Sequence, residues 1–144
     1  IMTAKVTDQS SPLVYGYDEI THVFRGNSPI YSVSDANRGY SPLQFGVKKY
    51  GNDDVPVHGK ETDEAADEPE DDAESEEASG KKPPLVISGG IVRGADVIDG
   101  QPAIVNKSVD DGHVVLFSWN PMHRHVNLHD HAFVYNAILN WNDL

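Results

Sequence analysis

The sequence predicts an α/β domain that is interrupted by a disordered acidic insertion. Residues 102–109 alternate between apolar and polar side chains, and a turn at 110–112 leads into the apolar run 113–119. Apolar residues then recur every three or four positions between 128 and 141, which is typical of a helix. Residues 59–82 contain no aromatic residue and no Val, Ile or Leu, so they cannot bury enough apolar surface to fold.

The charge of the chain is concentrated in one tract. The 144 residues, enough for a single domain, carry 23 acids and 11 bases. Residues 61–80 hold 11 of the acids and no base, which leaves 12 acids and 11 bases elsewhere. A nearly neutral remainder argues against nucleic acid as a partner. No apolar run reaches the roughly 18–20 residues of a membrane helix, and the lack of cysteine excludes disulfides and thiolate chemistry.

Three blocks are expected along the chain. Residues 1–58 are interpreted as the N-terminal part of the α/β domain, with short strands at Val14–Tyr15 and Pro29–Val33 between turn residues. Residues 59–82 are the acidic insertion, and residues 83–144 complete the same domain with a β-hairpin and a helix. The chain begins with Ile and without a signal-like segment, so we expect a piece of a longer protein.

The third block carries the clearest pattern. Leu85–Ile87 predicts a short strand, and Asp110-Asp111-Gly112 predicts the hairpin turn between 102–109 and 113–119. The second hairpin strand is almost continuously apolar, which is typical of a strand buried on both faces. A helix over 129–141 follows.

Four histidines precede or begin this helix, and imidazoles bind zinc, copper or nickel when three or four converge. The candidates are His123, His125, His129 and His131. His125 and His129 would share a helix face, whereas His129 and His131 would share a face only on a strand. Because no regular conformation gathers all four, we interpret the segment as a polar loop that leads into a helix, with a metal site as the alternative.

Two further residues lie at strand ends. Arg124 follows the second hairpin strand, at the edge where open α/β sheets bind ligands; alternatively it bridges loop carbonyls or pairs with Asp130. It is therefore a candidate ligand or interface contact. Ser88 precedes Gly89-Gly90, but no base or orienting group is identifiable for it, so we interpret it as a turn residue.

Several short motifs occur in order on both sides of the acidic tract. They are SPLVYGY at 11–17, SPIYSV at 28–33, SG at 88–89, GQPAIV at 100–105, DGHVVLF at 111–117, NPMHR at 120–124 and YNAIL at 135–139. Together they resemble the C-terminal region of bacterial zinc carboxypeptidases of the carboxypeptidase A type. Asp110 departs from a glycine of that pattern, and 126–131 replace its usual loop, so the extra histidines are specific to this chain.

The resemblance implies a fold and a role. The C-terminal region of such proteins is similar to class I glutamine amidotransferases, so a partial flavodoxin-like layered α/β domain is expected. Amidotransferase activity is not implied, because the chain has no nucleophilic cysteine. The parent would be a zinc-dependent exopeptidase, periplasmic or extracellular, whose zinc and catalytic residues belong to a catalytic domain missing from this chain. The His-x-x-Glu spacing at His58 and Glu61 is a weak candidate ligand pair beside the acidic tract.

Three hypotheses follow. The first is a non-catalytic accessory domain that packs against the upstream peptidase domain, with no catalytic residue, metal or cofactor of its own. The second is a small-ligand or metal-binding module that uses the segment 123–131. The third is an independent hydrolase of the amidotransferase-like fold that works without cysteine. Whether the parent is an active enzyme stays open, and we expect this chain alone to be inactive.

Overall fold

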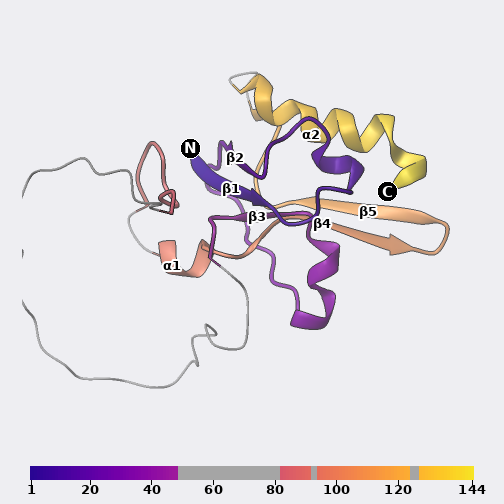
Figure 1. Ribbon diagram of the computed structural model, residues 1–144, viewed down its shortest axis with the longest axis horizontal. Helices are drawn as coiled ribbons and strands as arrows, with labels where there is room; N and C mark the ends of the chain where they lie inside the picture. The colour runs from indigo at the N-terminus through magenta and orange to yellow at the C-terminus, as the bar shows by residue number, and fades with distance from the viewer. Residues whose placement is uncertain (49–81, 92–93, 124–126) are drawn as a thin grey trace, which may run out of the picture.

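The computed structural model describes residues 1–48, 82–91, 94–123 and 127–144. Five strands form one sheet in the order β2-β1-β3-β4-β5, and each neighbouring pair is antiparallel. The main helix, α2, lies across one face of this sheet (Figure 1). The bounds are β1 Met2–Val6, η1 Pro12–Val14, β2 Ile20–Val23, η2 Asp35–Tyr40, β3 Leu43–Phe45, α1 Ala95–Ile98, β4 Pro102–Val109, β5 Gly112–Phe117, α2 Leu128–Leu139 and η4 Trp141–Asp143.

The mixed helix and strand content confirms the coarse α/β expectation. A flavodoxin-like arrangement, in which parallel strands have helices on both faces, is not confirmed. The pairing of β3 with β4 joins strands from the two sides of the acidic tract in one sheet. The acidic tract itself lies outside the described residues, apart from Lys82.

The C-terminal hairpin and helix occur where the sequence predicts them. Val109 pairs with Gly112, so Asp110 and Asp111 form a two-residue turn between β4 and β5. Asp110 has a φ of 51°, the left-handed conformation that such turns require and that Asp tolerates better than most residues. The helix spans Leu128–Leu139, close to the expected 129–141.

Three short strands were predicted wrongly, two in the N-terminal block and one at the start of the third block. The expected strand at Val14–Tyr15 is instead the end of the 3₁₀ helix Pro12–Val14, in which proline stands in the first turn and Leu13 is buried. Residues 29–33 form no regular element. The expected strand Leu85–Ile87 contributes only an isolated bridge between Val86 and Met2. Short apolar runs at these three places therefore do not predict which segments pair as strands.

The prediction that β5 is buried on both faces was also wrong. Its register places Phe117 opposite Ile104, and Leu116 opposite Val105. Because strand side chains alternate, Phe117 and Val115 face the core, whereas Leu116 points to the other face and is 38% exposed. Val109 and Val114 lie on the same face as Leu116 and are also exposed, so an apolar strand remains half open.

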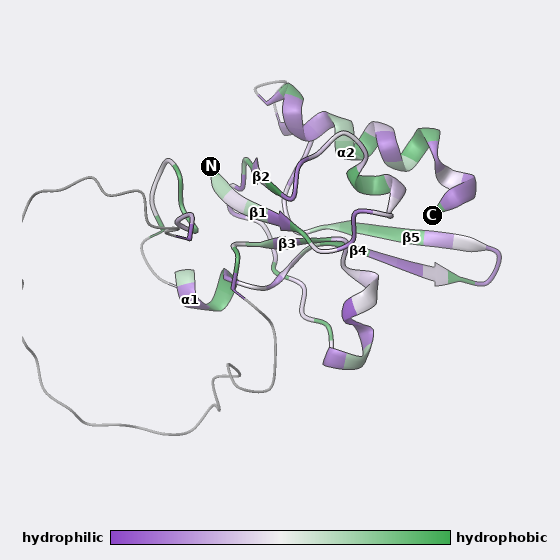
Figure 2. Cartoon of the chain, in the orientation of Figure 1, coloured by the Kyte–Doolittle hydropathy of each residue, from purple (hydrophilic) through white to green (hydrophobic). Residues whose placement is uncertain are grey.

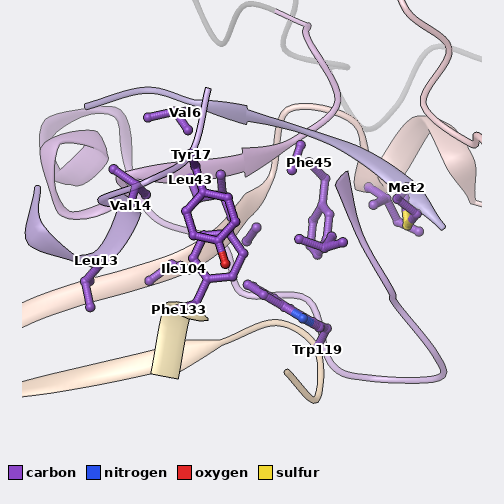
Figure 3. Close-up of a cluster of buried hydrophobic side chains, with 14 residues drawn as sticks. Met2, Val6, Leu13, Val14, Tyr17, Leu43, Phe45, Ile104, Trp119 and Phe133 are labelled. Carbon is purple, nitrogen blue, oxygen red and sulfur yellow. The ribbon is translucent and has the colours of Figure 1, made fainter. Parts of the chain in front are cut away.

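The core lies between the sheet and α2. Phe133 is fully buried, stacks on Tyr17 with ring centroids 3.9 Å apart, and meets Trp119 edge-on at 5.5 Å (Figure 3). The predicted apolar face of the helix is only partly buried, because Ile138 and Trp141 are 63% and 67% exposed. Hydrophobic residues therefore continue into the last turns of α2 (Figure 2), where Ala137 packs against the core while Ile138 is exposed.

Candidate functional site

The first turn of α2 buries a carboxylate. Asp130 is 1% exposed, and its Oδ2 accepts hydrogen bonds from the indole Nε1 of Trp119 and the backbone N–H of Phe24, both at 2.9 Å. Its Oδ1 accepts a hydrogen bond from Nδ2 of Asn127 at 2.8 Å. Asp130 thereby ties together the end of β2, the segment after β5, and the start of α2.

Burial raises the pKa of Asp130 above 3.8, because the charged form loses its hydration. The N–H donors of Phe24 and Trp119 act in the opposite direction, and so do the nearby imidazoles of His129 and His22. A position in the first helical turn also favours negative charge. These contacts compensate the buried carboxylate with hydrogen bonds rather than with a formal ion pair.

A pair of imidazoles lies beside this carboxylate. The rings of His129 and His22 stack with centroids 4.4 Å apart and planes 7° apart. Nε2 of His129 is 2.9 Å from Oγ1 of Thr21, and the hydroxyl of Tyr17 donates to the carbonyl of His129 at 2.5 Å. Burial lowers the pKa of His129, and the adjacent His22 lowers it further. Burial, with a smaller contribution from Asp130, raises the pKa of the Tyr17 phenol.

The structure separates the histidines that the sequence groups together. His129 belongs to the stacked pair with His22, and His131 is 2% exposed with its ring edge-on to Tyr135. His123 stacks on Phe24 at 5.6 Å. Among the described residues, no three His, Asp or Glu side chains are placed to hold a metal ion. His125, Arg124, His58 and Glu61 lie outside the described residues, so the roles considered for them stay predictions.

His22 was missed by the sequence analysis. It lies on β2, an edge strand with no clear hydropathy pattern, and 107 positions from its stacking partner. Only the antiparallel pairing of β2 with β1 brings it beneath the start of α2. No local spacing could have identified the pair.

A cavity of about 880 Å³ opens beside this network. It lies between the end of β2, the segment 86–91 and α1, and its polar lining residues include His22, Arg25, Ser88 and Asn127. Ser88, interpreted above as a turn residue, therefore faces the same space as a histidine and an arginine. A second cavity of about 580 Å³ lies near Lys5, Arg38 and Gln44.

Comparison of the chain with protein-family models, curated proteins and solved structures gives no match. In the described part of the chain, none of the helices is both long enough and apolar enough to span a bilayer.

Proposed function

We propose that this chain is a non-catalytic C-terminal accessory domain of a zinc metallocarboxypeptidase-like protein that acts in proteolysis. Its role is to pack against the upstream peptidase domain of the same parent chain. Zinc belongs to that peptidase domain. The proposal rests on the ordered motifs at 11–17, 28–33 and 88–139, and on one feature of the surface.

That feature is an apolar ridge at the end of α2 and the start of η4. We define the α2 ridge as Tyr135, Ile138, Leu139 and Trp141. The first three lie three and four positions apart, so they share one helix face. Their exposures are 50%, 63% and 79%, and that of Trp141 is 67%. Large apolar side chains clustered on one exposed face are typical of a surface that contacts another protein segment.

The open face of the hairpin supports the same interpretation. Val109 and Val114 are 48% and 45% exposed, beside the half-exposed Leu116. A domain that supports a neighbour needs such uncovered apolar surface, whereas an isolated domain gains nothing from it.

The proposal includes a finer assignment of the fold. The sheet with α2 on one face would be part of a class I glutamine amidotransferase-like, flavodoxin-like domain. Because the described strands pair antiparallel, parallel strands of that domain would come from residues outside those described here. The same relationship would place the parent protein in the periplasm or outside the cell.

Hydrogen exchange of the complete parent protein and of this chain tests the proposal. In the parent, amides of 135–141 and 109–116 are expected to exchange more slowly than in the isolated chain. Core amides of β1 serve as the control, because they are buried in both. Equal exchange at the α2 ridge, or an upstream sequence without a zinc peptidase signature, would contradict the proposal.

A second assay examines the isolated chain itself. We expect no release of C-terminal residues from a mixed peptide pool, and no tight zinc binding in calorimetric titration. Stoichiometric, sub-micromolar zinc binding that His125→Ala or His129→Ala abolishes would favour the metal-binding module instead.

A further inference from the structure

Arg25 is a cation without a carboxylate partner among the described residues. Two of its N–H groups donate to the carbonyls of Gly26 and Ser28, and its Nε is buried without a hydrogen-bond partner in the described chain. Its guanidinium carbon lies 5.6 Å from the centre of the Phe45 ring. Burial lowers the pKa of Arg25, yet a guanidinium keeps its proton in proteins. Within the described chain, this half-buried positive charge therefore contacts carbonyl oxygens and an aromatic ring but no carboxylate.

Arg25 is one of the residues that line the 880 Å³ cavity described above. Among the described residues that line it there is no Asp or Glu, and Arg25 is the one Lys or Arg. The ammonium of Ile1, another lining residue, donates to the carbonyl of Ser88. Asp130 accepts a hydrogen bond from the backbone of Phe24, the residue before Arg25, but its oxygens are already bonded to three N–H donors. Within the described chain, this buried carboxylate thus forms no ion pair with Arg25, and the ion pair found there joins Lys5 to Glu19.

The remaining lining combines polar groups at one side with apolar walls. His22 and Asn127 lie on the cavity with Arg25, while Ile98 and Val86 belong to its apolar lining. A volume of about 880 Å³ lies in the range of cavities that bind small molecules. Such a site fits a ligand with one anionic head and one apolar group.

We propose that this cavity binds a small organic carboxylate that carries an apolar group, with Arg25 as the residue that recognises the carboxylate. The guanidinium offers N–H donors to a carboxylate oxygen in a partly desolvated setting, where a charge-assisted hydrogen bond is strong. A phosphate dianion costs more to desolvate in a partly apolar cavity than a monoanion does, so a carboxylate is the better fit. This site is independent of the accessory role proposed above, because it lies away from the α2 ridge.

Titration of the ¹⁵N-labelled chain with 3-phenylpropionate tests the site, with 3-phenylpropionamide and inorganic phosphate as matched probes. We expect saturable shifts of the amides of Phe24, Gly89 and Asn127 with the acid alone. Binding is expected to weaken roughly tenfold or more in Arg25→Gln. Lys107→Gln is the charge-matched control, because Lys107 lies exposed on the hairpin, and it is expected to leave binding unchanged.

The comparison of acid with amide needs no variant, so it holds even where Arg25→Gln fails to fold. Equal binding of the amide would overturn the role of the charge. Tighter binding of phosphate than of the acid would overturn the assignment to an apolar carboxylate. A folded chain that shows no saturation with the acid up to roughly 10 mM would overturn the site itself.

Discussion

The first turn of α2 buries polar side chains, whereas its last turns leave large apolar side chains in solvent. Asp130 and His131 are 1% and 2% exposed, but Ile138 and Leu139 are 63% and 79% exposed. At its start, the indole of Trp119 donates to the buried carboxylate of Asp130. At its end, Ala137 still packs against the core, so the exposed Ile138 and Leu139 lie on the side of the helix that faces away from it. Burial along one helix therefore follows the side that faces the core and the supply of hydrogen bonds, not hydropathy alone.

The largest loss of stability is expected at Phe133, which lies between the two ends of α2. Phe133→Ala should lower the free energy of unfolding by about 3–5 kcal/mol, because it removes a fully buried ring that contacts Tyr17 and Trp119. Ile138→Ala, on the exposed end, should change it by about 0.5 kcal/mol or less. Urea unfolding of both variants measures the contrast. Similar losses would mean that the end of α2 is buried in solution.

The buried carboxylate gives the next largest effect. Asp130→Ala leaves the N–H groups of Trp119 and Phe24 without their acceptor, so we expect a loss of about 1–3 kcal/mol. The exposed Asp143→Ala is the control and should be close to neutral. Trp119 fluorescence should shift only in the first variant. An unchanged Asp130→Ala protein would show that water replaces the carboxylate at no cost.

The imidazole pair predicts a pH dependence. The pKa of His129 in the folded chain is lowered below 6.5, so the unfolded chain binds the proton more strongly. Its contribution to stability is present above pH 6.5 and is lost as the pH falls toward the folded value. The urea midpoint should decrease as the pH is lowered below 6.5. The dependence of the midpoint on pH should be weaker in His129→Gln.

His113→Gln is the control for this slope, because His113 lies exposed on the hairpin. Asp130 has the opposite sign: its raised pKa gives a contribution that is present below 3.8 and lost as the pH rises through the folded value. The difference between the wild-type chain and His129→Gln therefore isolates the histidine. An identical slope in both would exclude His129 as its source.

A small effect is also expected on the open face of the hairpin. Leu116→Ala should cost about 0.5–1 kcal/mol, since the side chain is 38% exposed in this chain. Ile104→Ala, on the covered face, should cost about 2–5 kcal/mol. Thermal unfolding of the two variants compares the faces. A loss at Leu116 as large as that at Ile104 would restore the original expectation of a strand buried on both faces.

Part of the candidate site was within reach of sequence reasoning. The helix predicted over 129–141 has Asp130 as its second residue, and the structure places Asp130 in the first turn of α2. The hydrogen-bond donors of Asp130 could not be predicted, because Phe24 is 106 positions away and donates through its backbone N–H. In the sequence, His129 lies among three other histidines between 123 and 131. In the structure, it stacks instead on the distant His22. Likewise, nothing near Arg25 in the sequence indicates that it lines a cavity with residues 86–91.

The sequence by itself determined the elements whose signals are local. Alternation at 102–109, the Asp110-Asp111 turn and the three- and four-residue spacing of the helix each depend on neighbours a few positions apart. Tertiary structure alone decided which face of β5 is covered, which end of α2 is buried, and which strands flank β1. These outcomes depend on surfaces brought together from distant segments. Hydropathy indicates that a side chain favours burial, but only the assembled sheet and helix determine whether another element covers that side chain.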